Sequence, residues 1–464
     1  MAFLIGGANT ESAAYEISNS LRFNDDDNPS LSKANSSGGS NTAGTLSFWT
    51  KRSEIDTGYL FYARSDDSNV FNVYFSGNER LEIRSTQGGS AQMSYKTNAL
   101  FRDPSAWYHI VIAIDTTDGT AADRCKLFVN GSRVTSFETQ TNFGSSNTIE
   151  FFQSDATVYV TGEFEGGTIG NPYDGYIADL NFVDGTQYDA SSFGETNDNG
   201  VWIPKKFTGS QGTNGFRLEF KQTGTSANSS GIGADTSGND NHLTPSNLAA
   251  ADITIDTPTN NFCTLNTLHK STSDVVLSEG NLKMVSGYSS GWQHCAATMA
   301  VRNGKWYWEA KALAVAATDK TSIGVFQFDT TDVDFIGVTN TDRSSKGLSG
   351  HGAGTGSYAY AQGDIVMCGM DLDNNKVYWG KNGTWFGSLD PAAGSGSTTQ
   401  TIDNSNFCVP AVGGYDDSSW ELNFGVPQFS ISSGNSDANG YGNFEYSVPS
   451  GFFALNTKNL AEYG

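Results

Sequence analysis

Apolar residues recur at every second position along most of the chain, and clusters of Gly, Asn, Asp and Ser interrupt them at short intervals. Spacing of i, i+2 is the period of a strand with one buried face, whereas an amphipathic helix needs i, i+3, i+4. Short strands separated by turn residues in this way are typical of sandwiches and barrels. The pattern therefore predicts an all-β protein with almost no helix.

The clearest predicted hairpin runs from Gly363 to Phe386. Met370–Asp373 alternates apolar and charged residues, and Val377–Trp379 supplies the β-branched and aromatic bulk that suits a half-buried sheet. An Asp-Asn-Asn turn joins the two strands, and Asn382-Gly383 predicts a second turn. We expect this hairpin to be scaffold, with any ligand contacting the loops around it.

The chain divides into five segments. A short leader occupies residues 1–18, and a first sandwich is predicted over 19–222. Residues 223–260 are rich in Gly, Ser, Asn and Asp, which predicts a connector. A second sandwich is predicted over 261–429, followed by a tail over 430–464 that contains a boundary strand. Strands of the first sandwich are expected at 21–24, 45–50, 59–63, 70–75, 107–115, 125–131, 173–180 and 216–220, the last lying near the first.

The chain carries a net charge of −23, from 50 acidic and 27 basic residues. Binding to nucleic acid relies on Lys and Arg that neutralise phosphates, so we expect no nucleic-acid partner. No apolar run approaches the length of a membrane-spanning helix, and the N-terminus lacks the basic region of a signal peptide. The five cysteines are scattered without a CxxC pair, which argues against a disulfide framework or a zinc site. We therefore expect no membrane insertion and folding in a reducing compartment.

Catalytic residues are hard to assemble from this sequence. Retaining glycoside hydrolysis needs two carboxyl groups about 5 Å apart, and Glu163 and Glu165 are the nearest pair on one strand face. They lie between glycines, so a solvated hairpin edge is the simpler interpretation. His294 and Cys295 are neighbours, but adjacent strand residues point to opposite faces. His109 belongs to a buried strand. We expect no enzymatic activity.

One acidic turn has the spacing of a calcium loop. Asp371, Asp373 and Asn375 match its positions 1, 3 and 5, but Lys376 stands where such a loop requires glycine. A strand turn is therefore expected there.

A second acidic run follows the first predicted strand. Asp25, Asp26 and Asp27 are adjacent, and three carboxylates in one loop repel one another unless a cation or solvent screens them. This run is a candidate site for a divalent cation.

Loop aromatics beside Asp and Asn are the residue types that hold sugars, because rings stack on pyranose faces and polar groups bind hydroxyls. The first sandwich has one such cluster and the second has two, together with a histidine in a glycine-rich loop. The candidate ligand residues are Asn171, Tyr173, Asp174, His351, Tyr358, Tyr360, Tyr415 and Asp416. An ordinary aromatic loop at the edge of the sandwich is the alternative for each cluster.

Several motifs resemble known families. The run DLDNNKVYWGKNGTW, with NGKWYWE before it and ELNFG after it, resembles the strand signatures of a SPRY domain. In the first half, SFWTKR, WYHIVIAID and KLFVNGSRV resemble a concanavalin A-like jelly roll in its laminin G-like form. These resemblances imply two β-sandwiches used for recognition, and the second one implies that calcium lies near the ligand loops.

A further set of motifs, FLIGGAN, NPYDGYIADLNFVDGTQYDASSFGETN, GFRLEF and DTSGNDNHLTP, resembles fibre proteins of tailed phages, in particular phages of marine bacteria. The resemblance implies that the N-terminal segment, with Phe3, Leu4 and Ile5, attaches the subunit to other virion proteins. It also implies a homo-oligomer, with a trimer favoured, in a virion assembled in the host cytoplasm.

The expected function is that of a non-enzymatic virion fibre protein that binds a host-surface glycan or protein. A tail fibre is favoured over a head fibre. Two alternatives stay open. One is a structural head or tail decoration protein without receptor binding, and the other is a glycan depolymerase.

Overall fold

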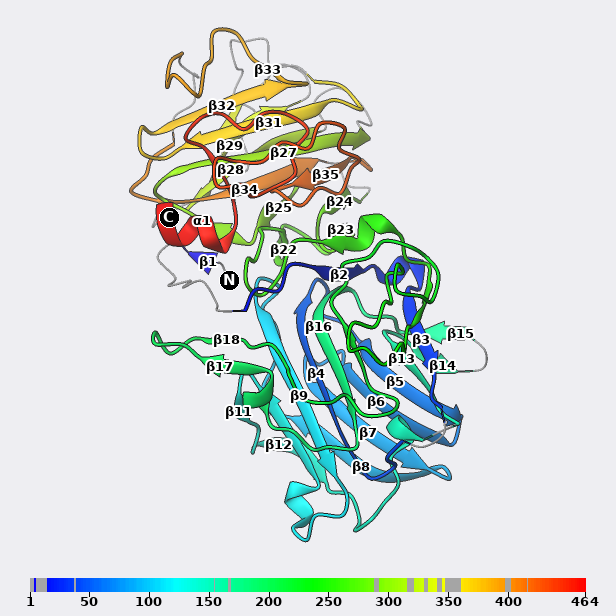
Figure 1. Cartoon of the computed structure of the whole chain (residues 1–464). Helices are drawn as coiled ribbons and strands as arrows, with labels where there is room; N and C mark the ends of the chain where they lie inside the picture. Colours follow the sequence, from blue (N-terminus) through cyan, green and yellow to red (C-terminus); the bar gives the residue numbers. More distant parts are fainter. Residues whose placement is uncertain are drawn as a thin grey trace. The chain divides into compact units, whose positions relative to one another are not determined.

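The computed structural model describes the chain except for residues 1–3, 6–14, 37–38, 154, 166–167, 288–291, 315–320, 329–332, 340–343, 347–359, 397–401 and 415. These described residues form strands, short 3₁₀ turns and one helix, α1 (Thr457–Tyr463). The chain divides into two compact units. The N-terminal unit comprises Glu11–Thr259, and the C-terminal unit comprises Asn260–Gly464 together with Met1–Thr10. The all-β prediction is confirmed (Figure 1). No helix in the part of the chain so described has the length and apolar character needed to cross a membrane.

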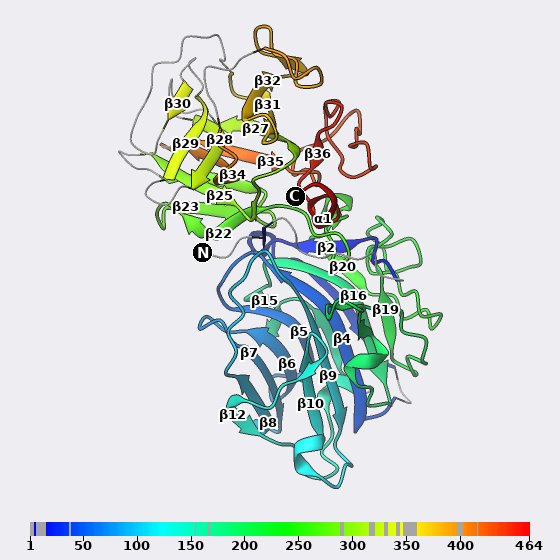
Figure 2. The ribbon, with the colours of Figure 1, turned by 90° about the vertical axis from the view of Figure 1, so that its left-hand side faces the viewer.

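The N-terminal unit is a sandwich of two antiparallel sheets (Figure 1 and Figure 2). The first sheet contains, in spatial order, β11 (Ser132–Arg133), β10 (Cys125–Val129), β9 (Trp107–Asp115), β4 (Ala43–Arg52), β16 (Gly175–Asp184), β2 (Ser20–Phe23) and β21 (Ile253–Thr254), with β19 (Phe216–Leu218) also paired to β16. The second sheet contains β12 (Phe137–Thr141), β8 (Ser90–Thr97), β7 (Leu81–Gln87), β6 (Asn69–Phe75), β5 (Gly58–Asp66), β13 (Thr157–Val160), β3 (Ser30–Ala34) and β20 (Thr244–Ser246). Two small hairpins, β14 (Glu163–Glu165) with β15 (Thr168–Gly170) and β17 (Gly194–Thr196) with β18 (Trp202–Pro204), lie outside these sheets.

Alternate side chains of the two sheets meet in one core, as the period-2 pattern predicts. Phe61 of β5 and Phe182 of β16, for example, stack with ring centroids 5.8 Å apart. Asn-Gly is a residue pair that favours a tight hairpin turn, and such a turn is present at Asn130-Gly131, with positive φ at both residues. The strand Phe216–Leu218 pairs with β16 instead of β2, but β2 pairs with the other end of the same strand.

The segment expected to be a connector, residues 223–260, differs from that expectation. Its strands β20 and β21 extend the two sheets of the N-terminal unit. Ile232, Leu243 and Leu248 are buried in the same core. Isolated apolar residues in a polar segment leave no periodic signal, so composition alone hides their contribution to the sandwich.

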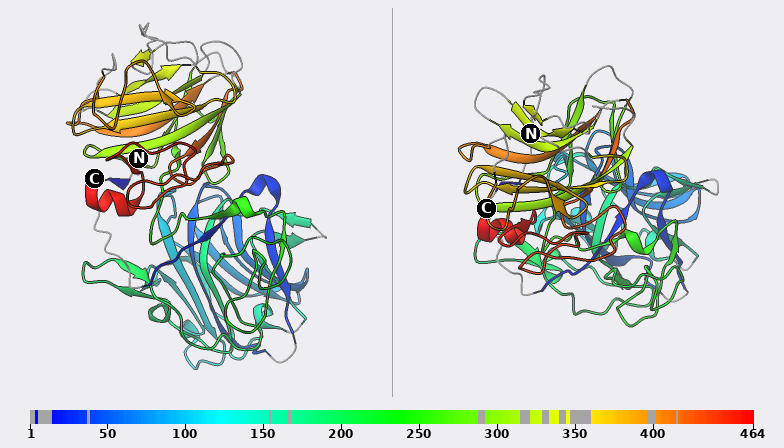
Figure 3. Two further views of the ribbon diagram at one scale, coloured as in Figure 1. Left: turned by 45° about the horizontal axis from the view of Figure 1, so that its top comes forward. Right: turned by 90° about the horizontal axis from the view of Figure 1, so that it is seen from above.

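The C-terminal unit is a second sandwich (Figure 3). One sheet contains β22 (Leu265–Lys270), β25 (Gln293–Ala297), β34 (Phe407–Gly414), β28 (Thr321–Phe328), β29 (Val333–Thr339) and β30 (Ser344–Lys346). The other contains β23 (Val275–Ser278), β24 (Lys283–Ser286), β35 (Ser419–Asn423), β27 (Lys305–Ala314), β31 (Ile365–Asp371), β32 (Lys376–Lys381) and β33 (Thr384–Trp385), with β36 (Phe453–Ala454) parallel to β27. Its core contains four fully buried tryptophans, Trp306, Trp308, Trp379 and Trp420.

The predicted hairpin is formed by β31 and β32. Asp371 is completely buried, and its carboxylate lies 3.1 Å from Nζ of Lys305. The backbone N–H of Gly304 donates to Oδ1 of Asp373. These contacts support the strand-turn interpretation of the acidic spacing.

The tail over residues 430–464 packs into the C-terminal unit. The buried carboxylate of Glu309 accepts hydrogen bonds from the backbone N–H groups of Glu445 and Tyr446. At its far end, Thr457 N–H donates to the carbonyl of Asn261, and Asn261 N–H donates to the Thr457 hydroxyl. The tail and the first residues of this unit are therefore paired with each other.

The N-terminal segment supplies one short strand, β1 (Leu4–Ile5). It pairs in parallel with β26 (Met299–Ala300) of the C-terminal unit. Of the three residues expected to anchor the subunit, Phe3 lies outside the described residues.

Candidate functional site

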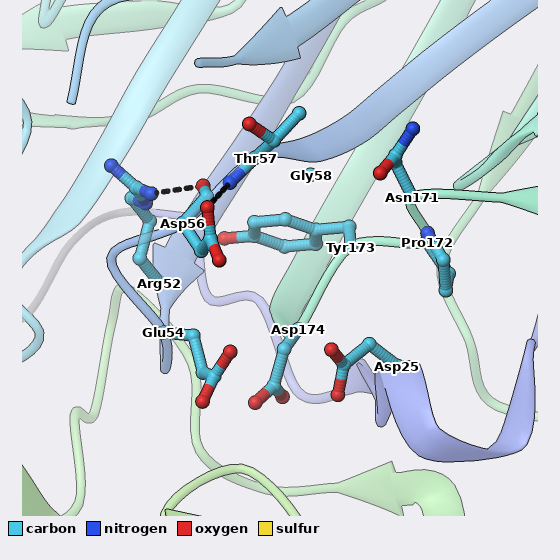
Figure 4. Close-up of a pocket in the computed structure, with 10 residues that line it drawn as sticks. All are labelled: Asp25, Arg52, Glu54, Asp56, Thr57, Gly58, Asn171, Pro172, Tyr173 and Asp174. Atoms are coloured by element: carbon cyan, nitrogen blue, oxygen red, sulfur yellow. Dashed lines mark hydrogen bonds between the residues drawn. The ribbon is translucent and has the colours of Figure 1, made fainter. Parts of the chain in front are cut away.

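The register of three neighbouring strands brings acidic residues together at one end of the first sheet. Gly175, the first residue of β16, pairs with Phe23 of β2 on one side and with Arg52 of β4 on the other. The residue before Gly175 therefore lies beside the residues that follow Phe23 and Arg52. Asp174, Asp25 and Glu54 meet in this way (Figure 4).

These three carboxyl groups line a pocket of about 260 Å³, which we call the acidic pocket. Its lining residues are Asp25, Arg52, Glu54, Asp56, Thr57, Gly58, Asn171, Pro172, Tyr173 and Asp174. All of them belong to the N-terminal unit. A pocket somewhat smaller than the ~300–1,000 Å³ of drug-sized sites suits one sugar residue or a sugar hydroxyl pair with an ion.

The three carboxyl groups crowd one another. An oxygen of each lies within 4.8 Å of an oxygen of the other two. Asp174 is 5% exposed, and neither of its carboxylate oxygens has a hydrogen-bond partner among the described residues. Burial, followed by the charges of Asp25 and Glu54, raises the pKa of Asp174 well above its ordinary value. Burial and the neighbouring Asp26 raise the pKa of Asp25 as well. The arrangement favours either protonation or a bound cation.

Of the acidic run predicted to bind a cation, only Asp25 enters this cluster. Asp26 and Asp27 are exposed, and Oδ2 of Asp27 accepts a hydrogen bond from Nδ2 of Asn24 at 3.0 Å. The second and third carboxyl groups come from Asp174 and Glu54 instead. Glu54 was not expected, because a single acidic residue after a strand has no distinguishing pattern.

Two sequence-predicted ligand residues also line the acidic pocket. Asn171 is exposed, has a φ of +42°, and donates from Nδ2 to Oε1 of Glu163 at 2.6 Å. Tyr173 is 2% exposed, and its hydroxyl donates to the carbonyl of Lys51 at 2.8 Å. The Tyr173 ring is thus part of the sandwich core and offers no free face for stacking.

Glycine is required where Tyr173 and β16 meet. Gly175 has a φ of +150°, and a Cβ built there would lie 2.3 Å from the Lys51 carbonyl oxygen and 2.6 Å from the Tyr173 hydroxyl. A side chain at Gly175 would therefore displace Tyr173, which lines the acidic pocket.

Of the ligand residues expected in the C-terminal unit, the structure describes only Tyr360 and Asp416, and these two do not form a common site. Tyr360 is buried in the core, with its ring centroid 5.4 Å from that of Trp420. Asp416 is half-buried and has a φ of +62°. His351, Tyr358 and Tyr415 lie outside the described residues.

The described side chains among the candidate catalytic residues are hydrogen-bonded to neighbouring side chains of the fold. Glu163 accepts from Asn171 and is hydrogen-bonded to Tyr59, while the Glu165 side chain lies outside the described residues. Trp202 donates to Nδ1 of His109 at 3.0 Å, which leaves Nε2 as the protonated nitrogen that faces Ser47. Because Nε2 carries the proton, His109 cannot accept one from the serine.

Comparison with known proteins finds a family model that matches part of the N-terminal unit. Residues 24–191 match the family model Laminin_G_3, the concanavalin A-like lectin/glucanases superfamily. These residues therefore carry a laminin G-like domain, a lectin-like fold that suggests carbohydrate binding. A search of curated proteins finds no match.

Several solved structures are similar to parts of the chain. The SPRY domain of human HERC1 is 15% identical, with 34% of this chain and 96% of that chain covered and a TM-score of 0.25. A heptameric SAP-like pentraxin from Limulus polyphemus is 19% identical, with 38% and 80% covered and a TM-score of 0.28. The CBM40 domain of Ruminococcus gnavus IT-sialidase, bound to α2,3-sialyllactose, is 16% identical, with 32% and 80% covered and a TM-score of 0.26.

Proposed function

We propose that the protein is a non-enzymatic virion fibre protein, a tail fibre, that binds a host-surface glycan through the acidic pocket. The observation that carries the proposal is Asp174, a buried carboxylate with two unpartnered oxygens that faces a pocket in a lectin-like domain. Buried polar groups without partners are rare in folded proteins and point to an absent ion, water or ligand.

The residues of the acidic pocket fit a calcium ion. Calcium takes about six to eight oxygen ligands, with carboxylates prominent among them. Asp25, Glu54 and Asp174 would hold the ion, since they supply carboxylate oxygens from three separate segments within 4.8 Å of one another. When bound, the ion would neutralise the carboxylates and offer coordination positions to sugar hydroxyls.

The depolymerase alternative was expected to use Glu163 and Glu165, but the three carboxyl groups of the acidic pocket are a second candidate set for such a reaction. The oxygens of these carboxyl groups lie within 4.8 Å of one another, which is comparable with the ~5–5.5 Å between the two carboxyls of a retaining glycosidase. However, each Asp174 oxygen has less than 1 Å² of accessible surface, so a polysaccharide cannot reach it. A small cation can be enclosed at such a position. Release of reducing ends from host polysaccharide, lost in Glu54→Gln, would support the depolymerase instead.

Attachment to the particle is proposed to occur through the N-terminal segment. Leu4–Ile5 has strand geometry and pairs with the edge of β26. An extended segment that adds to a sheet edge is a common way to join proteins. Released from β26, the segment would add to a sheet edge of another virion protein in the same way. The fibre would be a homo-oligomer, with a trimer favoured, in a virion assembled in the host cytoplasm. Its peptides are expected in purified particles, and their absence would overturn the assignment.

The binding proposal is tested by titration of the full-length protein with Ca²⁺ and by glycan-array binding with and without EDTA. Wild type is expected to bind Ca²⁺ and to bind glycans only when the ion is present. Asp174→Asn should lose both, while Asp240→Asn, at a side chain that is 89% exposed, should lose neither. Glycan binding that survives both EDTA and Asp174→Asn would place the ligand elsewhere. Absence of all host and glycan binding, with particle instability on deletion of the protein, would favour the decoration role.

A further inference from the structure

The outer face of the second sheet of the N-terminal unit carries a row of aromatic rings with a guanidinium group at one end. Successive side chains of a strand point to opposite faces of its sheet. Core residues of β5, β6, β7 and β13 therefore alternate with residues on the face that points away from the core. The contacting side chains that lie on this outer face or pack against it are Arg84 (β7), Tyr74 (β6), Tyr59 and Tyr62 (β5), Tyr159 (β13) and Phe164 (β14), which we call the aromatic row.

Each member of the aromatic row contacts the next. The guanidinium carbon of Arg84 lies 5.4 Å from the centre of the Tyr74 ring. The Tyr74 and Tyr59 rings are stacked, with their centroids 4.7 Å apart. Successive centroids from Tyr59 onward are 6.2 Å, 6.4 Å and 5.1 Å apart along Tyr62, Tyr159 and Phe164. Stacked and edge-to-face rings attract one another at such distances, so the row is held in one arrangement.

The aromatic row is rigid and still has accessible surface. The Tyr74 hydroxyl donates to Oε2 of Glu82 at 2.7 Å, and Nη2 of Arg84 donates to the same oxygen at 2.6 Å. The Arg84 side chain is nevertheless 52% exposed, and Tyr59 and Tyr159 are half-buried. Binding interfaces are enriched in tyrosine and arginine, and tyrosine gives a large contact area at a low cost in conformational entropy.

The aromatic row is continuous with the acidic pocket. Tyr59 directly follows Gly58, which lines that pocket. The backbone N–H of Tyr59 donates to the carbonyl of Asn171, another lining residue, at 3.0 Å. Glu163 accepts a hydrogen bond from the Asn171 side chain and is also hydrogen-bonded to Tyr59. A ligand that extends out of the acidic pocket past Asn171 therefore reaches Tyr59 next.

The dimensions require a ligand longer than one sugar residue. The acidic pocket has a volume of about 260 Å³, whereas the strands that carry Tyr59 and Arg84 are two strand spacings apart, or about 10 Å. We infer that the aromatic row binds the sugar residues that follow the one held in the acidic pocket, so that the ligand is a stretch of an extended glycan chain. This inference rests on the proposed glycan-binding function.

The experiment measures how affinity depends on glycan length. The probes are size series, from monosaccharide to octasaccharide, of the glycans on the array that tests the proposed function, and the full-length protein is titrated in Ca²⁺. Wild type is expected to bind the longest member at least about tenfold more tightly than the shortest member that binds, because linked contacts add to the affinity. Equal affinity along the series, lost in Asp174→Asn, overturns the inference and keeps glycan binding at the acidic pocket.

Variants of the aromatic row locate this gain with length. Arg84→Ala and Tyr159→Ala should each lower it at least threefold and leave the affinity for the shortest bound member unchanged, which also shows that the variants are folded. Tyr159→Phe keeps the ring and should keep most of the gain. Arg133→Ala, at a 39% exposed side chain of the other sheet, is the matched control and should behave as wild type.

Two further outcomes contradict the inference. A gain with length that is the same in Arg84→Ala, Tyr159→Ala and wild type would mean that the aromatic row only fastens the β14–β15 hairpin to the sheet. Absence of binding to every glycan on the array overturns the proposed function, and the inference with it.

Discussion

Replacement of Asp174 by asparagine tests whether the acidic pocket is built around a cation. Asp174 is almost fully buried, and both of its carboxylate oxygens lack hydrogen-bond partners in the part of the chain that the structure describes. Oxygens of two other carboxyl groups lie within 4.8 Å. Asparagine keeps the shape of the side chain and removes its charge. In the metal-free protein we therefore expect Asp174→Asn to stabilise the fold.

The size of this effect follows from the distances. Two unit charges separated by 4.8 Å repel by about 3.5 kcal/mol at an effective dielectric constant of ~20, and Asp174 faces two such neighbours. Asp25 and Glu54 are partly exposed, so solvent screens part of the repulsion, and about 2–4 kcal/mol is the expected gain. For a unit of this size, that gain corresponds to a rise in Tm of roughly 5–15 °C.

The pH dependence has a definite sign. The pKa of Asp174 is raised in the folded protein, so the folded state holds this proton more tightly than the unfolded state does. Its stabilising contribution is complete below the unfolded pKa of about 3.9 and is lost as pH rises through the folded pKa. Metal-free wild type should thus melt at a lower temperature at neutral pH than at mildly acidic pH, and Asp174→Asn should flatten this slope.

The assay is differential scanning fluorimetry in EDTA and in excess Ca²⁺. Wild type should gain about 2.7 kcal/mol of stability at a calcium concentration ~100-fold above Kd, and Asp174→Asn much less. Asp240→Asn is the matched control and should respond to calcium as wild type does. The reasoning is refuted if Asp174→Asn lowers Tm in EDTA, or if its response to calcium equals that of wild type.

Three further results are expected. Burial lowers the pKa of His109 to about 3, so its imidazole NMR signals should stay constant through mildly acidic pH, and a midpoint near the ordinary ~6.5 would contradict its burial. Lys51→Met removes the cation that lies 2.5 Å from the carboxylate of Asp256, in a pair whose side chains are each 1% exposed. Urea unfolding should show a loss of about 3–5 kcal/mol, against less than ~1 kcal/mol for Lys205→Met at an exposed pair, and equal losses would argue against the buried pair. Glu309→Ala removes the acceptor of two tail N–H groups, so limited proteolysis should cut within residues 430–446. Unchanged protection would mean that other contacts hold this segment.

Local sequence patterns predicted the elements of the fold well, because strands and tight turns are encoded by neighbouring residues. The turn at Asn130-Gly131 and the hairpin after Gly363 are examples. The role of residues 223–260 could not be predicted in the same way. Their few buried apolar residues, such as Ile232 and Leu243, are separated by polar residues and reveal their place only in the packed sandwich.

The candidate site shows the same division between local and non-local information. The local sequence around Asp25 indicates a cation ligand, and the local sequence around Asp174 indicates a sugar ligand. Their meeting depends on the register by which β2 and β4 flank β16, and pairing between distant strands leaves no trace in a single sequence. Glu54 depends on that register entirely, which is why no local pattern found it.

The hydrogen bonds between Asn261 and Thr457 have a consequence for how this protein can change. Apart from β1, which the N-terminal segment adds to β26, the C-terminal sandwich begins and ends at adjacent residues of the chain. A domain with adjacent ends can be inserted into a surface loop of another protein without opening its sheets. The sandwich between Asn261 and Thr457 can therefore be moved from one protein to another as a single domain.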